Sequence, residues 1–367
     1  MTEAWRAAAD PEDRRRILHI VEPAEAGEGA LAALADAQAA GARGRVIIVG
    51  DGRDANRARE YGMEPAGCVG RQRRAGGSTG WSRDARWLGG DALVCAWGEC
   101  SARAWGRLAP GGEPAVIVET DVPRAGARGA IPESSTLVAF GDAVARAWRG
   151  AGAFDVRVAP ADLGGVASER ARIGDDVRRA AGVSERGKLI GLLADPAERA
   201  DARWFAFVLG LMFAAGIEVG GVAPVGISGA RRGARFVRHH SRRWSLREWS
   251  GSLKEMCRVC DAVIAPACCE TGGGAEPRAS AGAAMLLSAA RSGAALVAVD
   301  CAVTRELSRA HPIIVARSGE GPEFGARLLD AFTSPVRGPG TRGGTGNGFG
   351  ATVRAILEEA ALGAGSR

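Results

Sequence analysis

One stretch of the chain combines the side chains that a phosphorylated ligand needs. A short apolar run at 261–265 is followed by the carboxylate of Glu270 and by Gly272 and Gly273, ahead of a predicted helix at 281–292. A carboxylate can hold ribose or sugar hydroxyls, and backbone N–H groups at a glycine turn and a helix N-terminus can hold phosphate. This order of residues predicts a site for a nucleotide or a nucleotide sugar.

A diphosphate also needs a cation, and two parts of the chain offer arginine. Arg199 follows a predicted strand at 188–193, and the densest basic run, 231–247, mixes arginines with histidines and a tryptophan. Basic and aromatic interleaving suits single-stranded nucleic acid, but this run covers one predicted strand and one loop rather than a continuous face. Nucleic acid is therefore the least favoured of the candidate partners. A solvated arginine surface, or one or two arginines directed at a diphosphate, are the other interpretations.

A second glycine pair, Gly27 and Gly29, lies between a predicted strand at 17–21 and a predicted helix at 28–40. With Asp51 after the next strand, the spacing superficially matches a dinucleotide fingerprint. The fingerprint turn normally follows its strand at once, whereas five residues separate the strand from Gly27 here. Glutamates at 22, 25 and 28 would also repel a pyrophosphate. An ordinary strand-to-helix turn is favoured, with NAD binding as an alternative.

Cysteine spacing gives little support for a metal centre. Cys257-x-x-Cys260 could begin a zinc site, but no second C-x-x-C follows, and Cys268 and Cys269 are adjacent. The eight cysteines are scattered through apolar segments, which is typical of small buried side chains. We expect no bound metal.

Short apolar runs alternate with helical stretches along the chain, which is typical of βαβ units in a mostly parallel sheet. The predicted strands are 17–21, 45–50, 92–96, 115–119, 136–140 and 155–159, then 188–193, 217–222, 234–238, 261–265, 294–299 and 312–315. The predicted helices are 28–40, 175–181, 199–215, 246–257, 281–292, 323–332 and 351–362. The fold class is therefore α/β, with two Rossmann-like open-sheet domains facing each other across a cleft.

The same pattern predicts where the domains begin and end. A flexible N-terminus at 1–13 precedes an N-terminal domain at 14–165 and a C-terminal, ligand-binding domain at 166–332. A linker rich in Gly and Pro, 333–350, is long enough to cross a cleft, so the last helix, within 351–367, is expected to return to the N-terminal domain. Open α/β sheets bind ligands at the carboxyl ends of their strands, which puts the site in the cleft.

Composition narrows the partners and the compartment. A net charge of +6 suits an anionic partner, whether a phosphorylated small molecule, a lipid head group or nucleic acid, and leaves a peripheral membrane contact open. Residues 1–13 contain charges and no apolar core, so they do not form a secretory signal. The longest uncharged run, 204–217, is too short to span a bilayer. We expect a cytoplasmic protein.

The segment 260–300 resembles the donor-binding segment of retaining glycosyltransferases of the GT-B fold, in the family called glycosyl transferases group 1. There, an Asp-headed strand leads to Pro-Ser, a Glu, a glycine-rich turn, a helix reading Glu-Ala-Met-Ala-x-Gly and a Pro-Val-Val-Ala strand. Here Asp261 heads the strand and Pro266 follows it, before the helix and the strand at 294–299. The similarity extends over nearly the whole chain, through 17–41, 136–152, 155–164 and 188–207.

Carried over by position, the resemblance implies a donor site and an acceptor-side loop. The implied donor-binding residues are Glu270, Gly272, Gly273, Arg199, Ser288 and Glu306, and the acceptor-side loop holds Gly27 and Gly29. The implied activity is transfer of a sugar, with retention, from a nucleoside diphosphate sugar to an acceptor that the sequence does not identify. The resemblance implies neither a cofactor nor an obligatory metal.

Several positions depart from the family pattern. Ser288 stands where the second Glu is expected, Leu192 replaces an arginine, and the paired glycines before Glu306 are replaced at 302–304. The spacing from Glu270 to Ser288 is about ten residues longer than the family's Glu-x7-Glu, and Glu276, within this longer spacing, is a candidate replacement carboxylate. We therefore expect weak, altered or absent transfer. A catalytically silent nucleotide-binding relative is the alternative, followed by an NAD-dependent enzyme.

Overall fold

The computed structural model describes residues 17–69, 92–109, 112–123, 131–163, 174–194, 202–225, 245–268, 278–333 and 348–364. Several sequence-based predictions fall outside these ranges: the N-terminus at 1–13, the strand at 234–238, most of the basic run, and the residues Arg199, Glu270, Gly272, Gly273 and Glu276.

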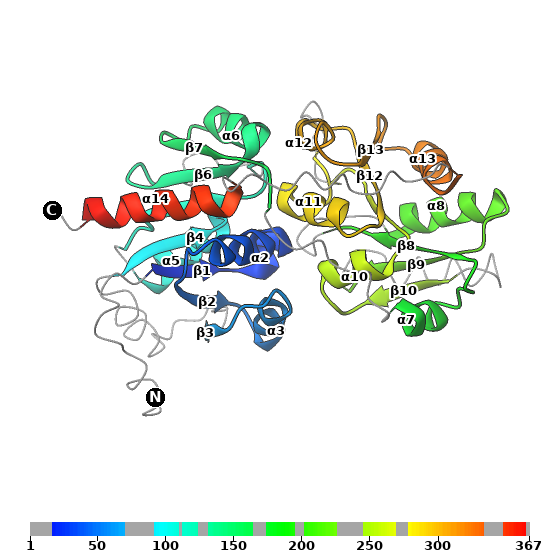
Figure 1. The fold of residues 1–367 in the computed structure, drawn as a ribbon, viewed down its shortest axis with the longest axis horizontal. Coiled ribbons are helices and arrows are strands. Elements are labelled where there is room, and N and C mark those ends of the chain that lie inside the picture. Colours follow the sequence, from blue (N-terminus) through cyan, green and yellow to red (C-terminus); the bar gives the residue numbers. More distant parts are fainter. Residues whose placement is uncertain are drawn as a thin grey trace.

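The described chain forms two open parallel sheets, one in each half of the molecule (Figure 1). The first sheet has seven strands in the order β3-β2-β1-β4-β5-β6-β7. Its strands are β1 (Ile17–Val21), β2 (Arg45–Val49), β3 (Pro65–Val69), β4 (Leu93–Trp97), β5 (Val116–Glu119), β6 (Thr136–Phe140) and β7 (Val156–Ala159). We call this sheet and its helices the first lobe.

The second sheet has six strands in the order β10-β9-β8-β11-β12-β13. Its strands are β8 (Lys188–Leu192), β9 (Val219–Pro224), β10 (Leu246–Trp249), β11 (Ala262–Ala265), β12 (Ala295–Val299) and β13 (Ile313–Ala316). This sheet and its helices form the second lobe. Each sheet reverses its strand order once, at β1 beside β4 and at β8 beside β11, and open α/β sheets bind ligands outside the strand ends at such a reversal.

Burial explains why these segments form parallel sheets. The inner strands β5 and β12 are buried along their whole length, as expected of strands covered by helices on both faces. The edge strands β3 and β10 are partly exposed. The predicted fold class, two Rossmann-like open sheets, is confirmed.

Helices connect the strands within each lobe. The first lobe contains α2 (Pro23–Ala39), α3 (Gly52–Glu60), α5 (Glu99–Leu108) and α6 (Gly141–Gly150), and the second contains α7 (Gly174–Ala180), α8 (Ala202–Ala214), α10 (Leu253–Val259), α11 (Ala283–Arg291), α12 (Ala302–Leu307) and α13 (Gly321–Thr333). Asp51 caps α3 by accepting hydrogen bonds from the backbone N–H groups of Arg53 and Asp54. Across the described residues, no helix is long and apolar enough to cross a membrane.

The predicted helix at 246–257 is wrong in its first part. Leu246–Trp249 instead forms the edge strand β10, which pairs in parallel with β9. The helix α10 begins only after Ser252, whose hydroxyl accepts a hydrogen bond from the backbone N–H of Glu255 at 3.3 Å. A serine N-cap therefore marks the true start of the helix.

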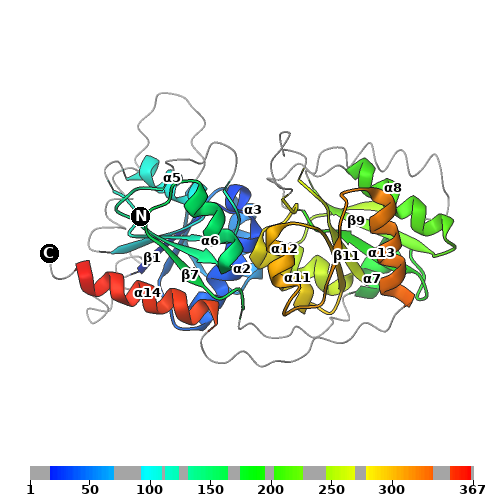
Figure 2. The same ribbon diagram turned by 90° about the horizontal axis from the view of Figure 1, so that it is seen from above.

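The last helix, α14 (Phe349–Ala364), lies against the first lobe (Figures 1 and 2). The backbone N–H of Gly350 donates to the Asp36 carboxylate of α2 at 2.9 Å. Arg157 of β7 forms a two-point ion pair with Glu359, at 2.5 and 3.0 Å. The ring of Phe349 packs on that of Phe140, with 4.9 Å between centroids.

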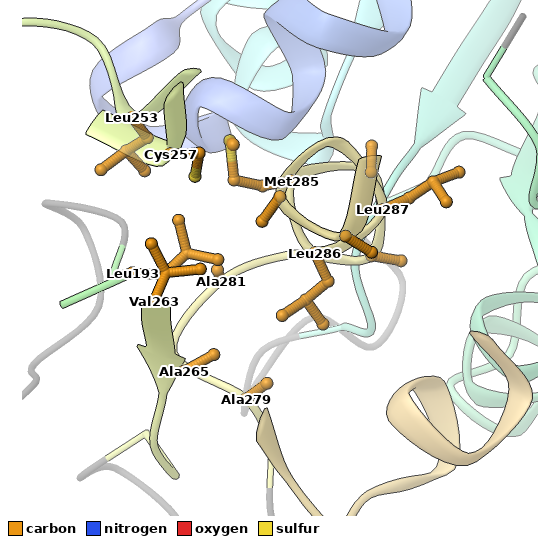
Figure 3. Packing of buried hydrophobic residues seen from close by; sticks show 14 of the residues in the cluster. Leu193, Leu253, Cys257, Val263, Ala265, Ala279, Ala281, Met285, Leu286 and Leu287 are labelled. Carbon is orange, nitrogen blue, oxygen red and sulfur yellow. The ribbon is translucent and has the colours of Figure 1, made fainter. Parts of the chain in front are cut away.

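The helix α11 of the second lobe packs against α2 of the first. Figure 3 shows Met285 next to Cys257 of α10, and Leu286 on the side of the helix that faces the strand β11. The hydroxyl of Tyr61, at the end of α3, lies 3.8 Å from the sulfur of Met285. The N-terminal end of α11 therefore reaches into the first lobe.

Candidate functional site

A cavity of about 420 Å³ lies between the two lobes, at the carboxyl ends of their strands. The first lobe contributes Asp121, Val122 and Pro123 after β5, and Ala143, Arg146 and Ala147 on α6. The second lobe contributes Arg278, Ala279 and Ala281 ahead of α11, and Cys301, Ala302 and Val303 at the start of α12. We call this the interlobe cavity, and its volume is within the range typical of small-molecule sites.

An ion pair crosses the interlobe cavity. The guanidinium nitrogen Nη2 of Arg278 lies 3.1 Å from Oδ2 of Asp121, with side-chain exposures of 19% and 31%. Oδ1 of Asp121 accepts a hydrogen bond from the backbone N–H of Val122 at 2.8 Å, and the backbone carbonyl of Asp121 accepts one from the indole of Trp148 at 2.9 Å. These bonds hold the carboxylate in place at the cavity wall. Arg146, exposed on α6, adds a second cation to the lining.

The backbone joins the lobes at the same place. The N–H of Ala283, in the first turn of α11, donates to the carbonyl of Thr120 at 3.0 Å. Ser280, just before this helix, donates its hydroxyl to the carbonyl of Leu193 at 2.7 Å, which ties the segment to the end of β8. The start of α11 is therefore anchored to both sheets.

Glu306 lies on α12 at the lobe interface, but its carboxylate is engaged with the first lobe. It accepts hydrogen bonds from the backbone N–H groups of Asp142 at 2.9 Å and Ala143 at 2.5 Å, at the N-terminus of α6. A carboxylate at a helix N-terminus satisfies otherwise unpaired N–H groups and interacts favourably with the helix dipole. The structure thus gives this predicted donor-binding residue a structural partner beside the cavity.

Gly27 and Gly29 are buried within α2 rather than in an open loop before it. The helix begins at Pro23 and is interrupted at Gly27, whose φ of 78° favours glycine. At Gly29, a Cβ atom would stand 3.4 Å from the Thr120 hydroxyl and 3.5 Å from the backbone nitrogen of Met285. Gly29 therefore lies where α2 packs against α11.

Glu306 extends from the second lobe to the first, and a second carboxylate extends from the first lobe to the second. Glu28 of α2 is only 1% exposed, and its Oε2 accepts hydrogen bonds from the Tyr61 hydroxyl at 2.9 Å and from the backbone N–H of Leu253 at 2.7 Å. Leu253 is the first residue of α10 in the second lobe. Each lobe thus supplies one carboxylate to the start of a helix in the other.

Ser288 is half-buried on α11, and the described cavity lining does not include it.

Glu270, Gly272, Gly273 and Arg199 lie outside the described residues. Two described residues flank the segment that contains the first three of them. Cys268 and Arg278, on either side of 269–277, are joined by a hydrogen bond from the Cys268 N–H to the Arg278 carbonyl at 2.8 Å. Arg278 itself lines the cavity.

The structure adds Asp121, Arg146 and Arg278 to the residues that sequence reasoning considered. Asp121 comes two residues after β5, a position where a carboxylate reaches the end of a parallel sheet. The position of Asp121 after a predicted strand could have identified it from the sequence as a candidate site residue. Its pairing with Arg278 could not, because that pairing depends on how the lobes meet.

Within the described ranges no cluster of His, Cys, Asp and Glu could hold a metal ion. Burial raises the pKa of the Cys257 and Cys260 thiols.

Comparison with protein-family models and with curated proteins finds no match. Solved structures do match along almost the whole chain. HepE of Anabaena, in complex with UDP and glucose, has a TM-score of 0.57 at 14% sequence identity, covering 96% of this chain and 97% of HepE.

Two other solved structures are similar. A glycosyltransferase from Rickettsia africae has a TM-score of 0.54 at 10% identity, covering 96% of this chain and 94% of its own. UGT89C1 of Arabidopsis thaliana, complexed with UDP, has a TM-score of 0.52 at 11% identity, covering 95% of this chain and 99% of its own. At these identities the likeness establishes the fold: the chain has the two-lobed GT-B architecture of glycosyltransferases.

Proposed function

We propose that this protein binds a nucleoside diphosphate sugar in the interlobe cavity and transfers the sugar, with retention, to an acceptor in the cytoplasm. The observation that carries the proposal is the cavity itself, at the carboxyl ends of both sheets, with Arg278 and Arg146 in its lining. The similar HepE and UGT89C1 structures contain UDP, which favours the same class of ligand here.

The described cavity suits the charge that sugar transfer creates. In the reaction the bond from the sugar C1 to the diphosphate oxygen breaks, and a bond from C1 to the acceptor oxygen forms. The proton of the acceptor hydroxyl passes to the departing diphosphate, so mass and charge balance. Negative charge grows on the leaving diphosphate, and a guanidinium hydrogen-bonded to it stabilises such charge. We assign this role to Arg278.

Transfer should be slow. The resemblance implies a second carboxylate at position 288, where this chain has serine, and a hydroxyl cannot supply the charge-assisted bond of a carboxylate, which is roughly twice as strong. The same substitution supports a second candidate function, a nucleotide-binding protein without transferase activity. The proposal needs neither a cofactor nor a metal ion.

A ligand-induced thermal shift tests the proposal. UDP, GDP, ADP and NAD are each added to the full chain, since a ligand at about 100 times its Kd adds about 2.7 kcal/mol of stability. One of the three nucleoside diphosphates should raise the melting temperature, and NAD should not. Stabilisation by NAD alone, or by none of the four, would overturn the proposal.

A second assay separates the two candidate functions. The nucleotide that stabilises the protein is supplied as its glucose and N-acetylglucosamine conjugates with a mixture of acceptors, and release of free nucleoside diphosphate is measured. Slow release that depends on an acceptor identifies a transferase. Binding without release identifies the silent relative.

A further inference from the structure

We propose that Asp121 is a built-in competitor for the diphosphate site: its carboxylate occupies the Arg278 guanidinium until a nucleoside diphosphate displaces it. This inference rests on the proposed function and names the residue that controls affinity at the same site. Removing the negative charge of Asp121 should therefore strengthen the binding of a nucleoside diphosphate.

The geometry places both partners on the cavity wall from opposite lobes. The Arg278 Nη2 to Asp121 Oδ2 distance of 3.1 Å is within the normal range of an N–H···O hydrogen bond, and the two groups carry opposite charges. Because each side chain is less than one-third exposed, at 19% and 31%, solvent screens the pair only in part. An anion entering the cavity therefore meets a guanidinium that is already neutralised.

Two further hydrogen bonds favour the present position of Asp121. Its Oδ1 accepts from the N–H of Val122 at 2.8 Å, and its backbone carbonyl from the Trp148 indole at 2.9 Å. The carboxylate therefore stays near the cavity after Arg278 turns to the diphosphate, and the two anions repel each other. Such repulsion weakens nucleotide binding and speeds the release of the diphosphate product.

The charge balance of the described lining fits this role. Apart from Asp121 and the two arginines, the lining residues are uncharged, mostly alanine and valine. Asp121 is thus the carboxylate of the described cavity lining that would repel a bound diphosphate. Replacing it with asparagine keeps an acceptor for the Val122 N–H and removes only the charge.

The interface offers a matched control. Asp162, after β7, forms an ion pair with Arg291 at the end of α11, at 3.3 Å and with exposures of 32% and 25%. This pair also joins the lobes and is similarly exposed, but neither residue is in the described cavity lining. Asp162→Asn therefore reports the effect of loosening the lobes without changing the charge of the cavity wall.

The test is isothermal titration calorimetry of the full chain with UDP, GDP and ADP, and with uridine, guanosine and adenosine as probes that lack phosphate. Asp121→Asn should bind the preferred diphosphate about tenfold more tightly, as expected for removing a like charge a few ångströms away at a partly exposed site. Arg278→Gln should bind it at least about tenfold more weakly. Asp162→Asn should match the wild type, and nucleoside affinities should not change.

Other results would overturn the inference in distinguishable ways. If the wild type binds a diphosphate and Asp121→Asn binds it equally or less tightly, the competitor role is wrong and the proposed function stands. An equal gain in Asp162→Asn would assign the effect to lobe opening and also reject the role. If neither the wild type nor Asp121→Asn binds any diphosphate, both proposals fail. Asp121→Ser replaces Asp121→Asn if that variant does not fold, and unfolding of both would make Asp121 a structural residue.

Discussion

His19 lies at the centre of the first sheet with no exposure to water. Its Nδ1 accepts a hydrogen bond from the indole N–H of Trp97 at 3.1 Å, so the imidazole proton is on Nε2, which lies 3.1 Å from the carbonyl of Ala42. A Cβ atom at position 44 would come within 2.9 Å of this nitrogen, so the glycine there leaves space for the ring. The folded protein therefore holds His19 neutral.

This arrangement makes the protein less stable in acid. Burial lowers the pKa of His19 from 6.5 to about 4, only partly offset by the hydrogen bond to Ala42. Below about pH 6.5 the unfolded chain binds a proton that the folded chain does not, so stability is complete above that pH and falls as the pH drops toward about 4. For these two pKa values the loss between about pH 8 and about pH 5 is about 2 kcal/mol.

Urea unfolding followed by tryptophan fluorescence measures this loss. The free energy of unfolding should fall by about 2 kcal/mol more in the wild type than in His19→Gln over that pH interval. The comparison is needed because burial, together with Arg291, also lowers the pKa of His311, which adds acid sensitivity of the same sign to both proteins. Equal pH dependence in the two proteins would show that His19 is protonated at no cost in the folded state.

Three further predictions concern the lobe interface. Glu28→Ala leaves the Tyr61 hydroxyl and the Leu253 N–H without this acceptor, so the free energy of unfolding should fall by about 2 to 4 kcal/mol in urea titration. Gly29→Ala should fold normally, because its Cβ makes ordinary contacts of 3.4 Å and more, whereas Gly29→Leu should separate the lobes and raise the radius of gyration in small-angle scattering. Glu306→Ala removes the cap of α6 and should lower the melting temperature by an amount equivalent to about 1 to 2 kcal/mol, with Glu306→Gln intermediate.

Sequence patterns predicted most of the fold because buried parallel strands are continuous apolar runs. The strands at 17–21 and 136–140 have the predicted ends. The edge strands were harder: β3 includes Pro65 and Gly67, and β10 has two adjacent charged residues between its apolar ends, so neither resembles a buried run. Edge strands depend on the neighbour they pair with more than on their own composition.

The candidate site was less predictable, for a physical reason. A motif within one segment, such as the glycines near 272, can be recognised from spacing alone. The pairing of Asp121 with Arg278, and of Glu306 with α6, joins residues more than 150 positions apart and depends on the orientation of two lobes. Nothing local to either residue specifies that orientation, so the contacts emerge only once both sheets are in place.

The proposed binding site is tested most directly by a crystal structure grown with the nucleoside diphosphate that most stabilises the protein. We predict that the diphosphate lies in the interlobe cavity, within hydrogen-bonding distance of the Arg278 guanidinium, and that the Arg278–Asp121 ion pair is broken. A nucleotide bound at the Gly27 bend of α2, or one bound elsewhere with the ion pair intact, would contradict it.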